Sequence, residues 1–301
     1  MTPLDWTIVL LYMLGIVVMS LYVGASQVSQ EDYYLGGRRM GPWTIAMSIL
    51  ATQCSSISLI GAPAFIALKP GGGLIWLQYE FALPLAMLLL ILFVIPIFHK
   101  TAFTTIYEYL EVRFGRLTRT LISNIFLLSR GLATGVSLYA TAVVLAGTIN
   151  VSITSMLLLV GGVSIAYTTI GGIKADIYSD IIQLIVLWIG ALVCIISLVN
   201  LMGGWEASLD AVPLDRARII DWGHHGLGDG GTYSFWCMLF GALFLYLSYY
   251  GCDQTQTQRL LTAESLPRAQ KALFLNGILR FPLVFTYCFF GLLLSGWVLR
   301  N

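Results

Sequence analysis

Charged side chains are scarce in this sequence. Its 301 residues include 16 Lys and Arg and 15 Asp and Glu, together 10% of the chain, whereas a soluble domain normally carries about 25%. The formal net charge of +1 provides no basic surface, so a nucleic-acid partner has no support. Hydrophobic residues make up 58% and the mean hydropathy is +0.84. We therefore expect an all-α polytopic membrane protein.

The sequence also lacks paired cysteines and a cleavable leader. Its five cysteines form no C-x-x-C pair, and they are Cys54, Cys194, Cys237, Cys252 and Cys288. They are better interpreted as small packing residues than as disulfides or metal ligands. The N-terminus MTPLDWTIVLLYMLGIVVMSLYVG has neither a basic leader nor a small-residue cleavage site, so we expect a retained first helix.

Long apolar runs, each near the ~20 residues that span hydrocarbon, predict about eight transmembrane helices. They are Trp6–Val23, Pro42–Phe65, Leu74–Phe98, Leu117–Ile149, Val151–Thr169, Ile177–Met202, Tyr233–Gly251 and Gln270–Val298.

The Lys and Arg residues predict the orientation. With the N-terminus outside, the inner segments hold ten of the 16, the outer segments hold four, and two lie inside spans. The inner ten are Arg38, Arg39, Lys100, Arg113, Arg116, Arg119, Lys174, Arg259, Arg268 and Lys271. The positive-inside rule then predicts a multi-pass protein of the plasma (inner) membrane with both ends outside.

Three connections are more than turns, and the first is a polar inner linker at residues 26–42, SQVSQEDYYLGGRRMGP. Residues 101–120, TAFTTIYEYLEVRFGRLTRT, have the pattern of an amphipathic helix at the inner interface. Residues 203–232 form a long outer loop that contains His224 and His225. This histidine pair is either part of a solvated loop or a metal site, and without a surrounding cluster of ligands the loop is the better interpretation.

The stretch ATQCSSISLIGAPAF at residues 51–65 is unusually polar for a membrane span. Its serines, Gly61 and Pro63 fit either close packing against another helix or a broken helix whose carbonyls line a cavity. A second segment, FGALFLYLSYYGCDQTQTQRLLTAES, turns polar at Gly251. Two interrupted helices in corresponding halves favour the broken helix and a secondary-transporter site near the bilayer midplane.

Four ionisable residues lie within or beside these spans, where charge is costly and usually functional. Glu80 is either a neutral buried acid or a cavity-lining carboxylate, and Arg130 either pairs with a carboxylate or faces an aqueous cavity. Arg280 either extends to the inner interface or contributes to a site, with Pro282 expected to kink its helix. Asp180 is either a capping residue or a cation ligand.

The whole chain resembles the sodium:solute symporter family. The resemblance is carried by DYYLGGRRMGPW at Asp32–Trp43, ATQCSSISLIGAP at Ala51–Pro63, YEYLEVRF at Tyr107–Phe114, TTIGGIKADIYSDIIQ at Thr168–Gln183 and YYGCDQTQTQR at Tyr249–Arg259. It implies a broken-helix, inverted-repeat (LeuT-like) transporter core of ten helices preceded by one extra helix. Residues 6–23 would be the extra helix, 42–202 the first five-helix repeat and 233–301 the first two helices of an incomplete second repeat.

The resemblance also implies a sodium site. Family members bind sodium through backbone carbonyls at the first break, which match Ala51 and Cys54, with a supporting aspartate that matches Asp180. The family's two hydroxyl ligands lie on the eighth core helix, which would follow Asn301. The resemblance therefore implies a C-terminally truncated domain with half of a sodium cage.

The substrate-binding residues are implied in the same way. Glu80, Arg130 and Arg280 match substrate-contacting positions of sugar or sialic acid transporters. On the second broken helix, Asp253-Gln254 stands where the family often has Asn-Gln, which replaces a neutral side chain with an ionisable one. Ser55, Ser56 and Ser58 match the face that meets substrate and ion, and Gln78 is a further candidate.

We therefore expect a sodium-coupled symporter of a small polar organic solute in a lipid bilayer, and not an enzyme. Two positive charges near the cavity favour an acid, whereas a Glu80–Arg280 or Glu80–Arg130 pair would favour a neutral sugar or polyol. A sensory module of the same fold and an inactive truncated fragment are the alternatives. Residues 1–301 alone are expected to show no sodium-driven uptake.

Overall fold

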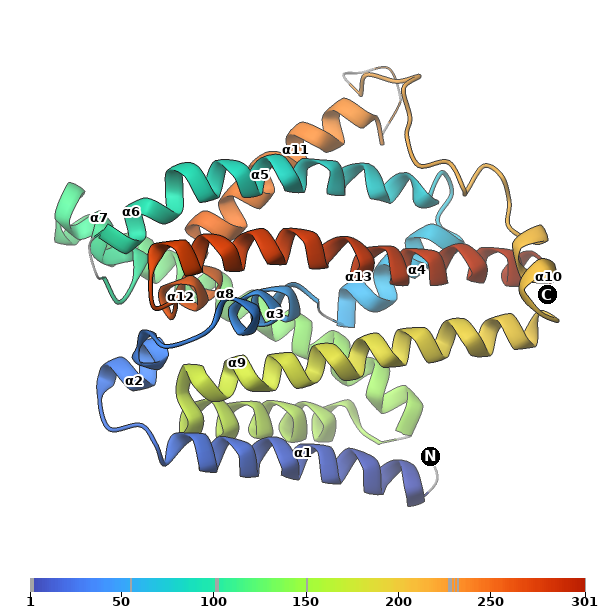
Figure 1. Cartoon of the computed structure of the whole chain (residues 1–301). Coiled ribbons are helices and arrows are strands. Elements are labelled where there is room, and N and C mark those ends of the chain that lie inside the picture. Colours follow the sequence, from blue (N-terminus) through green and yellow to red (C-terminus); the bar gives the residue numbers. More distant parts are fainter. Residues whose placement is uncertain are drawn as a thin grey trace.

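The computed structural model describes residues 3–54, 56–100, 103–149, 151–226, 229, 231 and 233–300, and every regular element within them is helical (Figure 1). The elements are α1 (Pro3–Gly24), α2 (Gln30–Leu35), η1 (Gly36–Arg38), α3 (Pro42–Gln53), α4 (Ser56–Leu68), η2 (Leu74–Phe81), α5 (Ala82–Leu89), η3 (Leu90–Val94), α6 (Ile95–Lys100), α7 (Ile106–Phe114), α8 (Arg116–Ile149), α9 (Ile153–Leu201), α10 (Trp205–Asp210), α11 (Phe235–Cys252), α12 (Gln254–Leu261) and α13 (Leu266–Arg300).

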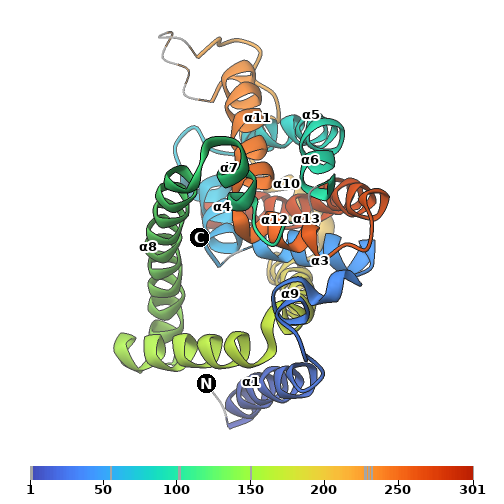
Figure 2. The same cartoon turned by 90° about the vertical axis from the view of Figure 1, so that its left-hand side faces the viewer.

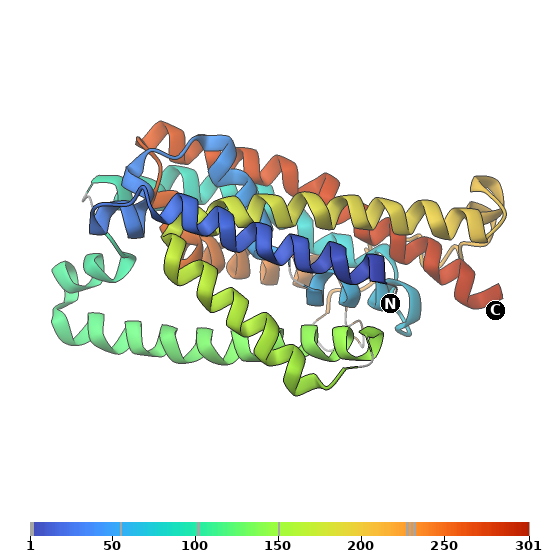
Figure 3. The ribbon, with the colours of Figure 1, turned by 90° about the horizontal axis from the view of Figure 1, so that it is seen from below.

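The helices agree with the eight expected spans once α9 is divided. Among the described residues, six helices are long and apolar enough to cross a membrane, or seven if α3 and α4 form one broken span. The 49 residues of α9 would extend about 73 Å, more than twice the ~30 Å hydrocarbon core. At Gly172 (φ 56°, ψ −161°) the helix turns back on itself (Figure 3). Counting α9 as two spans raises the number of candidate membrane spans among the described residues from seven to eight.

The first broken helix is confirmed, but its cause differs from the expectation. α3 ends at Gln53, Cys54 is extended (φ −90°, ψ 95°), and the axes on either side differ by 55°. Gly61 and Pro63 lie inside α4, so the interpretation that they favour a break is wrong. Pro63 serves close packing instead, because a Cβ at Gly291 of α13 would lie only 2.7 Å from the Pro63 Cα, whereas Gly61 is exposed.

The second broken helix is confirmed at the predicted place. α11 ends at Cys252, Asp253 is extended (φ −78°, ψ 119°), and α12 continues the chain. The Asp253 carboxylate accepts a 2.7 Å hydrogen bond from the Thr255 N–H and caps α12. α12 packs on α3, and α13 packs on both α3 and α4, so the two breaks belong to one bundle.

The remaining elements surround this bundle. α8 and the first half of α9 stand apart from it (Figure 2), and α1 begins at the end of the molecule where α13 finishes (Figure 1). The expected amphipathic helix is α7, which stops before Gly115 (φ 89°), so residues 116–120 belong to α8 instead. α13 runs through Pro282 without a break. The division into repeats stays a prediction.

Candidate functional site

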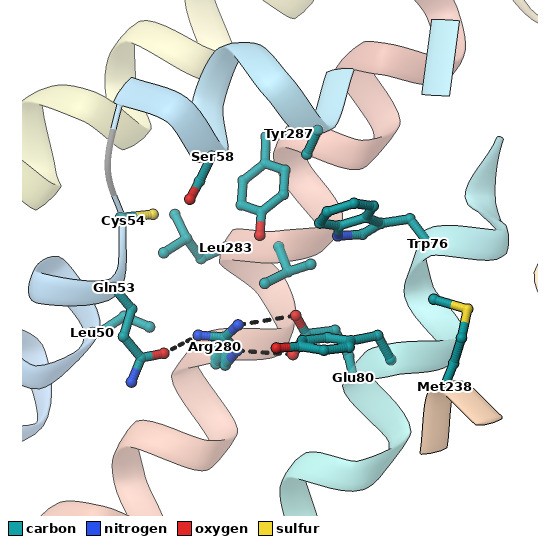
Figure 4. A pocket seen from close by; sticks show the side chains of 13 residues that line it. Leu50, Gln53, Cys54, Ser58, Trp76, Glu80, Met238, Arg280, Leu283 and Tyr287 are labelled. Carbon is teal, nitrogen blue, oxygen red and sulfur yellow. Dashed lines mark hydrogen bonds and ion pairs between the residues drawn. The ribbon is translucent and has the colours of Figure 1, made fainter. Parts of the chain in front are cut away.

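A buried ion pair joins η2 to α13 (Figure 4). The Arg280 Nε donates to Glu80 Oε2 at 2.8 Å, and Nη2 donates to Oε1 at 3.0 Å. The side chains are 13% and 5% exposed. Two parallel N–H···O bonds of this kind are strong and directional. Of the two pairs considered for Glu80, with Arg280 or with Arg130, the structure shows the pair with Arg280.

Side chains from the two broken helices support this pair. The Tyr246 hydroxyl of α11 donates to Glu80 Oε2 at 2.8 Å and accepts from Arg280 Nη2 at 3.1 Å. The Arg280 Cζ also lies 5.1 Å from the centre of the Tyr246 ring. At the end of α3, the Gln53 Oε1 accepts from Arg280 Nη1. Each of the three guanidinium nitrogens therefore donates at least one hydrogen bond.

A cavity of about 280 Å³ opens beside the ion pair. It is lined by Leu50, Gln53, Cys54, Ser58, Ala62, Trp76, Tyr79, Glu80, Met238, Arg280, Leu283, Val284 and Tyr287. Its walls come from α3, α4, η2, α11 and α13, and most of them are apolar or aromatic, with few polar groups. That composition is typical of a small-molecule site.

The structure places three predicted substrate residues in this cavity: Ser58, Glu80 and Arg280. Ser55 lies outside the described residues. Gln78 is fully buried but does not line the cavity. Its Nε2 donates to the Tyr233 carbonyl at 2.8 Å, and its Oε1 accepts from the Asp221 N–H at 2.8 Å. Gln78 therefore anchors the outer loop two residues before Glu80.

The other three predicted substrate residues meet at the second break, outside the cavity. Arg130 Nη1 lies 3.5 Å from Asp253 Oδ2, so Arg130 pairs with a carboxylate, and that carboxylate is not Glu80. The Gln254 Oε1 accepts from the Ile106 N–H at 3.0 Å and attaches α7 to α12. Arg130 and Asp253 thus connect α8 to the broken helix.

A second ionic cluster surrounds Asp180. Arg259 Nη2 donates to Asp176 Oδ2 at 2.7 Å and to Asp180 Oδ2 at 2.8 Å. The Ser48 hydroxyl of α3 donates to the same Asp180 oxygen at 2.6 Å. The Arg259 side chain is 5% exposed and lies on α12, so Arg259 is a buried helical residue rather than a loop residue, while its position on the inner side of the membrane stays a prediction. Sequence reasoning missed the burial of Arg259 because this residue follows a polar segment. Only its position after the second break could have indicated that it is buried.

The predicted sodium ligands lie at the end of α3 next to this cluster. The Ala51 carbonyl accepts from the Cys54 N–H at 2.9 Å in the turn that ends the helix. A carbonyl has two lone pairs, and a helix C-terminus carries partial negative charge that favours a cation. The neighbouring Thr52 hydroxyl lies 3.4 Å from Asp180 Oδ2. Hard oxygen donors therefore converge between α3 and α9.

The outer loop is held by its own carboxylates. Asp221 Oδ2 lies 2.7 Å from His224 Nδ1, and Asp221 Oδ1 accepts from Arg218 at 2.7 Å. The His224 hydrogen bond, with smaller contributions from Gly223 and Arg218, lowers the Asp221 pKa against the opposing effect of desolvation. Within the described part of the chain, no group of three His, Cys, Asp or Glu side chains is placed to hold a metal.

Two broken membrane helices beside a cavity that has a buried ion pair in its wall are the architecture of a secondary transporter. A family model confirms this class in detail: residues 33–298 match the sodium:solute symporter family. The chain belongs to that family.

Known relatives agree. The chain is 30% identical to the human sodium/iodide cotransporter over 284 residues, covering 93% of this chain and 43% of that protein. It is 28% identical to human sodium-coupled monocarboxylate transporter 1, covering 91% and 44%. The rabbit sodium-dependent multivitamin transporter is 29% identical, with 92% and 42% covered. The chain thus spans less than half the length of these relatives.

A solved structure confirms the fold. It is described as a substrate-bound, outward-open state of a Na+-coupled sialic acid symporter, and its TM-score with this chain is 0.88 at 23% sequence identity. The match covers 100% of this chain and 63% of the symporter chain. The predicted broken-helix transporter core is therefore correct.

Proposed function

We propose that this domain carries a small polar organic solute across the plasma membrane by sodium-coupled alternating access. The single observation that carries the proposal is the cavity between the two broken helices, with the Glu80–Arg280 pair in its wall. Its 280 Å³ suit a compact solute. The domain makes or breaks no chemical bond in this process, so we propose a transporter and not an enzyme.

The charges around the cavity favour a neutral solute over an organic acid. Glu80 and Arg280 compensate each other, and Arg130 is paired with Asp253 away from the cavity. The two positive charges that favoured an acid are therefore already balanced within the protein. A sugar or polyol can hydrogen-bond to the polar atoms of this wall while its C–H surface packs against Trp76 and Tyr287.

The charge of the second cluster supports sodium as the coupling ion. Asp176 and Asp180 surround one guanidinium, so with all three ionised the cluster has a formal charge of −1. This charge lies beside the α3 carbonyls, where the helix dipole also favours a cation. Sodium bound there would stabilise one arrangement of the broken helix, and that difference in affinity couples ion to solute. The Lys and Arg distribution supports an N-terminus outside.

Ligand binding tests the proposal directly. The protein expressed from its complete reading frame is purified in detergent and mixed with a labelled monosaccharide or a labelled short monocarboxylate, in NaCl or in KCl. We expect the sugar to bind in NaCl and at least tenfold more weakly in KCl. Tighter binding of the carboxylate would overturn the argument for a neutral solute, and equal binding in both salts would overturn sodium coupling.

Uptake separates a transporter from a sensor of the same fold. In proteoliposomes, an inward sodium gradient should drive accumulation of the bound solute. Sodium-dependent binding without any accumulation would instead identify a sensory module. Residues 1–301 expressed alone should not accumulate solute, and uptake by them that Asp180→Ala abolishes would contradict this expectation.

A further inference from the structure

A basic cavity lies far from the solute site, where α1, the segment before α3 and the turn of α9 meet. Its volume is about 660 Å³, and its lining includes Tyr22, Ser26, Arg39, Lys174 and Tyr178. Tyr22 is two residues from the end of α1, and Lys174 is two residues beyond the reversal at Gly172. Tyr22 and Lys174 therefore lie near the ends of apolar helices that are long enough to cross a membrane.

The walls of this cavity are held by specific backbone contacts. The Tyr33 hydroxyl donates to the Thr169 carbonyl at 2.9 Å, and the Gln27 Nε2 donates to the Gly171 carbonyl at 2.5 Å. A Cβ at Gly36 would lie 3.4 Å from the Lys174 Cγ. The chain between α1 and α3 is thus fixed against the turn of α9, and the cavity is a built feature of the fold.

Two cations in this cavity lack a bonded carboxylate. Within the described part of the chain, neither Arg39 nor Lys174 has a carboxylate oxygen within 4.0 Å, although their neighbour Arg38 pairs with Glu31 at 3.2 Å. Asp32 interacts electrostatically with Lys174, and its carboxylate is bonded to the Ser29 hydroxyl at 2.9 Å. Arg39 is exposed and Lys174 is half-buried, so both can reach an added anion.

Apolar surface continues from the cavity along both membrane helices. On α1, Tyr22 is followed at helical spacing by exposed Val18 (54%) and Leu14 (59%). On α9, Tyr178 is followed by exposed Ile182 (38%) and Ile185 (47%). A free phosphate would make no contact with these apolar residues, whereas the acyl chains of a phospholipid can pack along them.

We infer that this cavity binds the headgroup of an anionic phospholipid, with Arg39 and Lys174 on its phosphate and its acyl chains along α1 and α9. Basic pockets between membrane helices on the cytoplasmic side are suited to such headgroups, and each added Lys or Arg near an anionic surface strengthens binding several-fold. The site is separate from the solute cavity and does not depend on the proposed transport function.

Native mass spectrometry tests the inference. The delipidated protein is mixed with equimolar phosphatidylglycerol and phosphatidylcholine. We expect phosphatidylglycerol to be retained, and Arg39→Gln/Lys174→Gln to weaken it roughly 10- to 30-fold. The matched control, Arg116→Gln/Lys271→Gln, removes two exposed basic residues outside the cavity and should bind like the wild type. The charge-conserving Arg39→Lys/Lys174→Arg should also retain the lipid.

Three results would overturn the inference. Equal retention of both lipids would exclude recognition of the anionic headgroup. An equal loss in the control variant would show that only overall charge matters. Displacement of the lipid by millimolar glycerol phosphate, at the affinity of phosphatidylglycerol itself, would identify a soluble phosphate compound as the ligand. Thermal melting of each variant verifies that it is folded, and the charge-conserving variant keeps the test valid if the glutamine variant unfolds.

Discussion

Arg280 illustrates how a membrane protein accommodates a charge that its solvent cannot hydrate. Glu80 neutralises it, while Tyr246 and Gln53 each accept a further hydrogen bond from it. Removing one partner of such a pair leaves the other charge buried without compensation, which typically costs about 3–5 kcal/mol. Replacing both partners costs much less, because no isolated charge remains.

We therefore predict that Glu80→Gln lowers the free energy of unfolding by about 3 kcal/mol. Thermal melting in detergent should show a clear drop in the melting temperature. Glu80→Gln/Arg280→Gln should melt above Glu80→Gln, despite carrying one more substitution. A double variant that melts at the sum of both losses would contradict the pairing.

A smaller effect is expected at Tyr246. Tyr246→Phe removes the hydrogen bond to Glu80 and the one accepted from Arg280, so the expected loss is about 1–2 kcal/mol. Tyr249→Phe is the matched control, because Tyr249 is a half-buried tyrosine three residues away on the same helix. Equal melting temperatures of the two variants would show that the Tyr246 hydroxyl contributes nothing to the pair.

At the scale of elements, sequence reasoning located the broken helices but not the partners of their charges. The Ser- and Gly-containing segments around Cys54 and Gly251 predicted both breaks, because small polar residues weaken a helix locally. The depth of Arg130 in its helix was also readable from spacing. The helix that Arg130 faces depends on the direction in which its side chain leaves the helix and on packing between segments distant in the sequence. The sequence alone therefore could not decide between a Glu80–Arg280 and a Glu80–Arg130 pair.

Double-mutant cycles test that assignment. Arg130→Gln and Asp253→Asn should be non-additive, because their side chains are 3.5 Å apart. Arg130 is about one third exposed, so we expect a coupling below about 1 kcal/mol. Arg130→Gln and Glu80→Gln should be additive. The Asn side chain in Asp253→Asn can still cap α12, so Asp253→Ala should lower the free energy of unfolding by roughly 1 kcal/mol more than Asp253→Asn does. Strong coupling between Arg130 and Glu80 would contradict the structure.

The outer loop is expected to loosen in acid. Because the Asp221 pKa is lowered in the folded protein, mainly by His224, Asp221 stabilises the loop above the ordinary Asp range. This contribution is lost as the pH falls through the lowered pKa. Hydrogen exchange of the loop should therefore rise only well into the acid range.

His224→Ala should shift that onset to higher pH, because it removes the largest cause of the lowered Asp221 pKa. The measurement is exchange of the backbone amides of the outer loop between about pH 3 and pH 6. His225→Ala is the control, because His225 lies 3.5 Å from Asp229 and not beside Asp221. An identical shift in both variants would show that the hydrogen bond to His224 is not responsible.

For the molecule as a whole, the charges next to the two broken helices in the described part of the chain include two balanced pairs and one unbalanced cluster. Glu80–Arg280 and Arg130–Asp253 each sum to zero. Of these three groups, the Asp176–Arg259–Asp180 cluster keeps a negative charge, and it joins α9 to α3 and α12, one half of each broken helix. A bound cation there would hold together the elements that must move in alternating access.

Sodium should therefore stabilise the protein expressed from its complete reading frame, and Asp180 should be needed for that. At a sodium concentration 100 times the dissociation constant, the gain is about 2.7 kcal/mol, measured as a higher melting temperature in NaCl than in KCl of equal ionic strength. Asp180→Asn neutralises the cluster and should abolish the difference between the salts, whatever its effect on melting in KCl. Glu264→Gln removes one exposed acid elsewhere, from the pair with Arg268, and should preserve it. A sodium effect that survives Asp180→Asn would place the ion away from α3 and α9, and the solute cavity would then have to be coupled to it by a different route.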